Sequence, residues 1–189
     1  MNKIICIVGM TGSGKSEVAD ELVKAKYHFI RFGQITLDKV KENGLEPTEE
    51  NERKIRERIR KEYGMGAYAT LNIPKFDALL EKGNVVADGL YSWTEYKLLK
   101  DYYEDNIIIL AVLAPPQLRY ERLTKRTQVD EQMRSRPASK EQAQSRDFAE
   151  IENIEKGGPI AMADYYILNT GTKEELKKKT QEFLQKIKE

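Results

Sequence analysis

The chain has very little of several residues that would point to specialised chemistry. Its 189 residues include one cysteine and one histidine. A disulfide framework is therefore impossible, and a zinc site built on cysteines is excluded. Cys6 lies in an apolar run, where we interpret it as a small buried hydrophobic residue. His28 has no second histidine with which to share a metal ion, so we interpret it as structural or incidental.

Charge of one sign and long apolar segments are also missing. Lysine and arginine total 32 and aspartate and glutamate total 31, so the chain lacks the basic field of a protein that coats nucleic acid. The N-terminal apolar run is much too short to span a membrane, and no cleavage-site pattern follows it. We therefore expect a cytoplasmic protein without a membrane or nucleic-acid partner. The sequence leaves the oligomeric state open.

Five short apolar segments alternate with segments of helical periodicity. Their β-branched residues are typical of strands buried on both faces of a parallel sheet. We therefore expect an α/β fold of the P-loop NTPase type, with three α/β/α layers around a five-stranded parallel sheet. The expected strands are 4–8, 27–32, 84–88, 106–113 and 165–168. The expected helices are 16–26, 49–62, 67–72, 75–80, 94–103, 115–126, 147–156 and 174–187, with Pro74 as a candidate break.

The whole chain, 1–189, is expected to form one domain, because its length fits one core and no repeat or low-complexity linker interrupts it. Two segments fit the core pattern poorly, and we predict that they are flaps over a site. One is an acceptor-side flap at about 33–71 and the other is a lid at about 127–146. The charged helix of the first flap has a narrow apolar stripe, and most of its arginines are expected on a solvated face. The stripe consists of Ile55, Ile59 and Tyr63.

The octapeptide GMTGSGKS directly follows the first apolar segment and precedes a helical pattern. It matches G-x-x-x-x-G-K-[ST] in full and in the required context. Its glycines allow the backbone to approach phosphate oxygens, and the helix N-terminus favours negative charge. Lys15 is expected to reach the β and γ phosphates, and the Ser16 hydroxyl to bind Mg²⁺. The motif does not choose between ATP and GTP; ATP is the expected donor. The expected binding residues are Gly9, Thr11, Gly12, Ser13, Gly14, Lys15, Ser16 and Glu17.

Asp88 ends the apolar segment NVVAD, so we expect it at the carboxyl edge of the sheet beside the glycine loop. Ligands of open parallel sheets bind at that edge. Asp88 is therefore a candidate catalytic residue, either as a Mg²⁺ partner of Ser16 or as a group that helps to deprotonate an acceptor. The alternative is an aspartate that only caps the turn before Gly89.

Missing motifs narrow the class of P-loop protein. The chain has no N-K-x-D or D-x-x-G motif of a GTPase and no L-S-G-G-Q-like stretch of a transporter ATPase. Helicases and AAA-type motors are usually longer and need further motifs. These absences favour a compact phosphotransferase.

Arginines supply the positive evidence for phosphoryl transfer. The moving group spreads its charge over several oxygens, so transfer needs cations around it. A flap that carries arginines would provide them on closing and would expel water. Arg126 and Arg146 are the catalytic candidates, whereas Arg119 and Arg134 are expected to be ordinary surface arginines.

Five segments occur in order along nearly the whole chain: GMTGSGKSEVA, IRKEYGMGAYA, VVADGLYSW, PPQLRYERLTKR and IAMADYYILNTGT. With this series the chain resembles the small P-loop kinases of the adenylate kinase and dephospho-coenzyme A kinase group. Within that group it is most similar to an archaeal-type branch of kinase-related proteins, whose substrate the resemblance does not name. The glycine loop alone is not diagnostic of the group; the ordered series is fairly specific.

The resemblance implies roles on the donor side. ERLTKR is similar to the helix that enters the lid of adenylate kinases. There, the arginine matching Arg122 stacks on adenine and the one matching Arg126 contacts phosphates. Arg146 resembles the lid arginine that meets the transferred phosphoryl group. Asn169 and Gly171 belong to the segment NTG, which resembles the loop passing near the adenine base.

Departures from the resemblance lie on the acceptor side. FGQ stands where adenylate kinases have T-G-D, and DGLYS stands where they have D-G-F-P-R. Leu37 and Tyr91 thus replace two arginines that grip the acceptor phosphate in those enzymes. Either Arg31, Arg56 or Arg60 replaces them, or the acceptor is not an ordinary nucleoside monophosphate. We favour Arg60, which precedes the YG that matches the branch. The expected acceptor-binding residues are Gly33, Gln34, Arg60, Gly89 and Tyr91.

The expected function is transfer of the γ-phosphoryl group of Mg–ATP to a small nucleotide-like acceptor. A nucleoside monophosphate already carries the attacked phosphate, whereas dephospho-coenzyme A offers a ribose hydroxyl that needs a base. The lost arginines favour the second acceptor, and the similarity to adenylate kinases favours the first. The alternative function is a slow ATPase that acts as a nucleotide-dependent binding or regulatory module. The near-neutral charge argues against a kinase of RNA ends.

Overall fold

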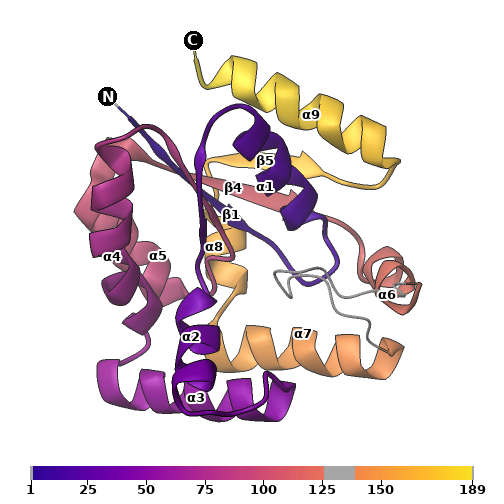
Figure 1. Ribbon diagram of the computed structural model, residues 1–189. Helices are drawn as coiled ribbons and strands as arrows, with labels where there is room; N and C mark the ends of the chain where they lie inside the picture. Colours follow the sequence, from indigo (N-terminus) through magenta and orange to yellow (C-terminus); the bar gives the residue numbers. More distant parts are fainter. Residues whose placement is uncertain (1, 126–138, 189) are drawn as a thin grey trace.

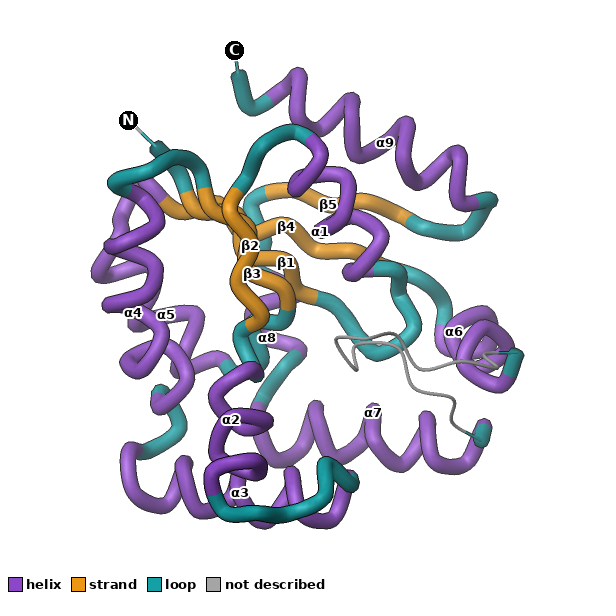
Figure 2. The backbone as a smooth tube through the Cα atoms, in the orientation of Figure 1, coloured by secondary structure: helices purple, strands orange, loops and turns teal. Residues whose placement is uncertain are grey.

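The computed structural model describes residues 2–125 and 139–188, and these have the expected α/β architecture (Figure 1). Five parallel strands form one sheet in the order β2-β3-β1-β4-β5. Figure 2 shows the strands side by side with helices on both faces. The strands are β1 (Ile4–Val8), β2 (His28–Arg31), β3 (Val85–Asp88), β4 (Ile107–Leu113) and β5 (Tyr165–Leu168). All five expected strands are confirmed, with ends shifted by at most one residue.

Two apolar clusters hold the layers together. Alternate residues of the fully buried β1 point to opposite faces of the sheet. Ile5 and Ile7 pack with the helices α1 (Lys15–Lys24) and α9 (Lys173–Lys186). Cys6 faces the other cluster, which includes residues of α4 (Ala67–Leu80) and α5 (Trp93–Tyr103). Burial raises the pKa of the Cys6 thiol to about 12, which agrees with its interpretation as a buried hydrophobic residue.

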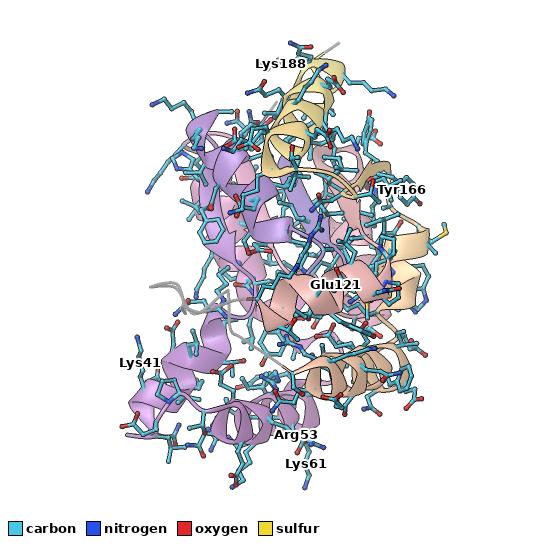
Figure 3. The ribbon with its side chains drawn as sticks, turned by 90° about the vertical axis from the view of Figure 1, so that its right-hand side faces the viewer. Lys41, Arg53, Lys61, Glu121, Tyr166 and Lys188 are labelled. Atoms are coloured by element: carbon cyan, nitrogen blue, oxygen red, sulfur yellow. The ribbon has the colours of Figure 1, made fainter. Side chains whose placement is uncertain are left out.

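The segment expected as an acceptor-side flap is mostly helical. It contains α2 (Gln34–Glu42), which the sequence did not predict, and α3 (Glu49–Tyr63). The glycine at the start of α2 offers no side-chain cap, and Thr36 stands among its buried positions, so both the cap signal and the apolar pattern are weak. Ile55 and Ile59 are buried as expected, but Tyr63 is 52% exposed, so its place in the apolar stripe was wrong. Arg53 and Lys61 of α3 are exposed to solvent (Figure 3), whereas Glu52 is buried.

The remaining helices differ from the sequence expectation at Pro74, at the start of α7 (Lys140–Ile154) and at α8 (Gly157–Ala161), which the sequence did not predict. Pro74 does not interrupt α4, which runs through it. The helix expected at 147–156 begins seven residues earlier, as α7. Ser139 caps α7 by accepting from the Gln142 N–H, and Gln142 accepts in return from the Ser139 N–H. The other helical elements are α6 (Pro116–Thr124) and a short 3₁₀ turn, Glu104–Asn106. Across the two described ranges, no helix is both long and apolar enough to cross a membrane.

Candidate nucleotide-binding site

The glycine loop joins β1 to α1 at the carboxyl edge of the sheet (Figure 2). Gly12 and Gly14 have φ of 82° and 102°, a conformation that side chains disfavour. A Cβ at Gly12 would lie 2.9 Å from the Arg119 carbonyl oxygen on α6, so space also demands glycine there. The Lys15 ammonium donates to the carbonyls of Gly9, at 2.8 Å, and Met10, at 3.1 Å. In this form of the molecule the lysine therefore folds back over its own loop.

Ser16 and Asp88 meet where α1 starts and β3 ends. Asp88 lies opposite Ile7 in the parallel register, which places its carboxylate beside the loop. The Ser16 hydroxyl lies 3.5 Å from Asp88 Oδ2. Mg²⁺ binds oxygen ligands at about 2.0–2.1 Å, so neighbouring ligands of one octahedral ion stand about 3 Å apart. A hydroxyl and a carboxylate at this separation fit one Mg²⁺ ion after a small adjustment.

Lys15 sits in a site with several other charges. Burial, followed by the positive charge of Lys156, lowers its pKa to about 7, whereas Asp88 and Glu150 act in the opposite direction. A lysine so perturbed next to a phosphate-binding loop is typical of a functional site. A polyanion that enters the loop will favour the charged ammonium again.

Arg119 is buried, so the sequence expectation of an ordinary surface arginine was wrong. Its guanidinium forms two hydrogen bonds with the Asp147 carboxylate, at 3.0 and 2.6 Å, and donates to the Thr11 carbonyl at 2.9 Å. The Tyr120 hydroxyl donates to the same carboxylate. Arg119 thus ties the glycine loop to α6 and α7. Nothing in the sequence links Arg119 to Asp147, because no spacing rule relates residues on two different helices. Arg134 lies outside the described residues.

The residues expected near adenine converge beside the glycine loop. The Asn169 amide donates to the Ser13 carbonyl at 2.8 Å. Arg122 donates to the Asn169 carbonyl, at 3.1 Å, and to the Gly171 carbonyl, at 3.3 Å. A Cβ at Gly14 would lie 2.4 Å from the Asn169 amide nitrogen, so these segments pack tightly. The structure therefore brings together α6, the glycine loop and the segment after β5.

The acceptor-side residues lie at the ends of β2 and β3. Arg31 and Asp88 face each other in the register, and Gly33 and Gly89 follow them. The Tyr91 hydroxyl lies against both glycines, because a Cβ would be 3.4 Å from it at Gly33 and 3.1 Å at Gly89. Burial raises the pKa of Tyr91, while Arg146 and Arg31 oppose that shift.

Arg60 lies elsewhere in the flap. Its guanidinium is 5.4 Å from the Tyr68 ring centre, and its charge acts on the pKa values of Tyr68 and Glu95. Arg31, by contrast, acts on Tyr91 and stands opposite Asp88. The geometry thus favours Arg31 over Arg60 as a cation next to the candidate centre. Gln34 donates to Asp38 within α2.

Sequence reasoning missed Lys156 and Glu150. Lys156 is 1% exposed, and its ammonium donates to Glu150 Oε2 at 2.6 Å. Arg146 donates to the other carboxylate oxygen, Oε1, at 2.9 Å. No motif marks this lysine, and the expected helix 147–156 began after Arg146, so the four-residue spacing of Arg146 and Glu150 on one helix gave no signal. Arg126 and the first part of the expected lid lie outside the described residues.

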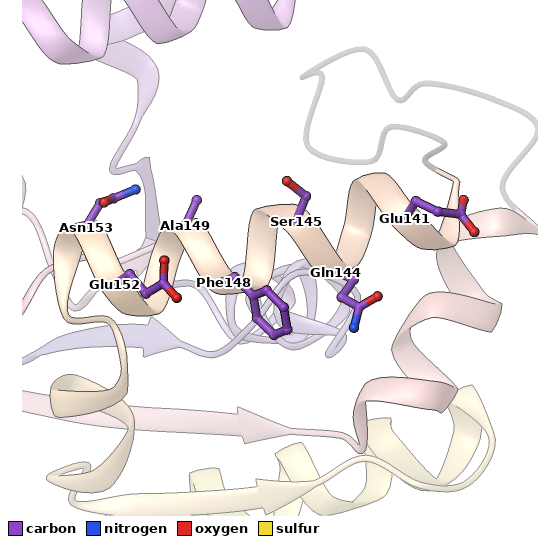
Figure 4. A pocket seen from close by; sticks show the side chains of 7 residues that line it. All are labelled: Glu141, Gln144, Ser145, Phe148, Ala149, Glu152 and Asn153. Carbon is purple, nitrogen blue, oxygen red and sulfur yellow. The ribbon is translucent and has the colours of Figure 1, made fainter.

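The outer face of α7 differs from the face that meets the loop. It forms a shallow pocket around Phe148 with polar neighbours (Figure 4). None of the expected site residues lines this pocket. The candidate chemistry therefore lies on the inner side of α7.

Glu17, which follows the glycine loop, pairs with Lys173 at 2.7 Å and so joins α1 to α9.

Solved structures of known kinases share this fold. A gluconokinase from Sinorhizobium meliloti 1021 has a TM-score of 0.60 at 16% identity, with 98% of this chain and 93% of that chain covered. A dephospho-CoA kinase from Campylobacter jejuni has a TM-score of 0.54 at 14% identity, with 98% and 97% covered. At these identities the likeness shows the fold alone, which is that of the P-loop kinases.

Sequence relatives define the family. The model of an AAA domain family matches residues 5–149. A UPF0200 protein from Thermococcus gammatolerans is 39% identical over 186 residues, which cover 97% of this chain and 95% of the relative. The chain therefore belongs to the UPF0200 family and carries its P-loop AAA domain in a kinase-like fold.

Proposed function

We propose that the protein is an ATP-dependent phosphotransferase that moves the γ-phosphoryl group of Mg–ATP to a small nucleotide-like acceptor. The observation that carries the proposal is the meeting of Ser16 and Asp88, 3.5 Å apart, at the mouth of the glycine loop. The pair fits a Mg²⁺ site beside the donor phosphates, which a slow ATPase also needs, so dependence on an acceptor is what distinguishes the two functions. A nucleoside monophosphate and dephospho-coenzyme A remain the two acceptors to separate.

The chain's own residues divide the work between donor and acceptor. The loop amides and Lys15 hold the donor phosphates, while Arg122, Asn169 and Gly171 lie towards the adenine. Ser16 and Asp88 would hold Mg²⁺, which supplies charge neutralisation at the phosphates. Arg146 faces the same region from α7.

The transfer step itself has a simple balance. An acceptor oxygen forms a bond to the γ phosphorus, and the bond from that phosphorus to the β–γ bridging oxygen breaks, which releases ADP. If the acceptor is a hydroxyl, Asp88 is the carboxylate placed to take its proton. If it is a phosphate, no proton need be removed and Asp88 serves through the metal. Gly33, Gln34, Gly89 and Tyr91 are the proposed acceptor contacts, with Arg31 added on geometric grounds.

The test is ATP consumption with Mg²⁺ against a panel of acceptors. The panel holds AMP, CMP, UMP, GMP, their deoxy forms and dephospho-coenzyme A, together with a no-acceptor control. The Lys15→Ala variant is the matched background, because loss of the loop lysine removes phosphate binding. One acceptor that raises turnover far above the control supports a kinase. Equal slow hydrolysis in every well contradicts the proposal for these acceptors and favours the regulatory ATPase.

Asp88→Asn tests the role of the carboxylate itself. With a hydroxyl acceptor, the loss of the base should lower the transfer rate by about 100-fold or more. ATP affinity in the absence of metal should change little. Transfer by Asp88→Asn at the wild-type rate would show that the assigned role is wrong.

A further inference from the structure

Lys156 is a buried cation close to the candidate centre. It stands between α7 and α8, and its side chain is 2% exposed. Its charge is the strongest electrostatic influence on Lys15. Its ammonium also lies 4.9 Å from the ring centre of Tyr91, on the acceptor side. The lysine is therefore near both halves of the site while itself shielded from solvent.

Glu150 connects this buried cation to a more exposed one. Its Oε2 accepts from Lys156, at 2.6 Å, and its Oε1 accepts from Arg146, at 2.9 Å. The Arg146 side chain is 49% exposed. One carboxylate thus bridges an inner ammonium and an outer guanidinium, so the order from core to surface is lysine, glutamate, arginine.

Stability does not explain this arrangement well. Two buried charges lose their hydration, so a buried pair is weak evidence for a stabilising contact. Arg146 and Glu150 alone would form an ordinary pair four residues apart on a helix, which is too weak to hold a long side chain in one place. Burial alone would raise the pKa of Glu150, but Lys156 and Arg146 together hold it well below its usual range. The inner lysine keeps the carboxylate ionised and fixed.

We propose that Lys156 is a positioning residue: it fixes Glu150, and Glu150 in turn aims Arg146 at the transferred phosphoryl group. This inference rests on the proposed function for the role of Arg146. The contact of Lys156 with Tyr91 shows that these three residues lie next to the acceptor side of the site.

The test is a double-mutant cycle between Lys156 and Arg146. The readout is the rate of ATP turnover at saturating ATP, with the acceptor found in the panel or, without one, as slow hydrolysis. ATP affinity is measured separately by calorimetry. The cycle can be measured on slow ATP hydrolysis alone. Failure to find an acceptor would therefore contradict the proposed function but leave the test of this inference in place.

Lys156→Met should lower the turnover rate by about 100-fold, because a small displacement of a catalytic group has effects of that size. Its ATP affinity should stay within about threefold of wild type, because Lys156, Glu150 and Arg146 are proposed to act on the transition state and not on bound ATP. In the Arg146→Ala background, Lys156→Met should have an effect of less than about threefold, because coupled residues are not additive. Lys156→Arg should recover part of the lost rate.

Lys186→Met is the matched control. Lys186 on α9 lies 5.8 Å from the ring centre of Tyr165 on β5, so this variant removes a similar cation–aromatic contact away from the site. It should turn over ATP at the wild-type rate. If Lys156→Met fails to fold, Glu150→Gln combined with Lys156→Met leaves no buried charge unpaired. That double variant should be as slow as Arg146→Ala.

Two results would overturn the inference. The first is an equal loss from Lys156→Met with and without Arg146, which would mean that the lysine acts independently. The second is a wild-type rate in the folded Glu150→Gln and Lys156→Met double variant.

Discussion

The helices α7 and α9 have nearly the same length but attach to the molecule by different physics. The inner side of α9 is largely apolar, with Leu176, Phe183 and Leu184 buried in a core cluster. The inner side of α7 carries two buried carboxylates, Asp147 and Glu150. Cations from other parts of the chain, Arg119 and Lys156, meet them.

The difference follows from what each helix faces. Apolar contact is non-directional and indifferent to charge, so it suits α9, which covers the sheet. Ion pairs are directional and respond to other charges, so they suit α7, which faces the phosphate-binding loop. The contacts that hold α7, next to the phosphate-binding loop, can therefore respond to a bound anion, whereas those that hold α9 cannot.

The largest expected effect on stability comes from breaking the ion pair between α6 and α7. Asp147→Asn should lower the free energy of unfolding by about 4 kcal/mol, because it leaves the Arg119 guanidinium buried without its carboxylate. Urea unfolding measures this change. Arg119→Met combined with Asp147→Leu should restore most of the loss, since no charge is then buried. A loss below about 1 kcal/mol in the single variant would argue against a tight buried pair.

Trimming α9 should cost somewhat less and respond differently to conditions. Leu184→Ala should lower the free energy of unfolding by about 3 kcal/mol through lost burial and a cavity. The loss should be the same at low and high salt, whereas the cost of Glu150→Gln on α7 should depend on salt, because its partner Arg146 is half exposed. Glu182→Ala, on the exposed side of the same helix, serves as the control. An equal salt dependence in both helices would remove the distinction between them.

Acid should weaken α7 before α9. The pKa of Glu150 is depressed by Lys156 and Arg146, so its contribution to stability is present above the unfolded pKa and is lost as pH falls through and below about 4.5. Glu150→Gln should therefore cost about 2 kcal/mol near pH 7 and progressively less in acid. Unfolding of both proteins across pH 3–7 tests this. A constant difference would contradict the assigned pairing.

The smallest effect is a proton taken up with the nucleotide. Lys15 has a pKa of about 7 without ligand, and bound phosphates will raise it, so binding should take up a fraction of a proton near neutral pH. ATP affinity should then weaken by at most about tenfold per pH unit above pH 7. Calorimetry in two buffers of different ionisation enthalpy measures the uptake. Lys15→Arg, which stays charged, should bind ATP without it.

The same contrast decides what could be read from the sequence. Buried strands and α9 were predictable, because their apolar residues recur at the periods of strand and helix. The start of α7 was not, since two of its four buried residues are charged and look like surface positions. The glycine loop and the place of Asp88 followed from a motif and from strand polarity.

The ion-pair partners lay beyond sequence reasoning. Arg119 and Asp147 are 28 residues apart, on different helices, and no spacing rule joins them. Lys156 has no motif and lies in a short connection between helices. The preference for Arg60 in the acceptor site came from its place beside a motif and stays a prediction, whereas the strand register sets Arg31, another of the three candidates, beside Asp88. Polar contacts between distant segments depend on the finished packing.

Cys6, the single thiol of the chain, has a practical consequence. It is fully buried in the central strand, and its pKa of about 12 leaves almost no thiolate at neutral pH. Thiol reagents should therefore not react with the native protein. A cysteine introduced in place of the exposed Arg53 on α3 would then be the only reactive thiol. One fluorophore attached there could report on the acceptor-side helices during turnover, and Cys6 would not have to be replaced first.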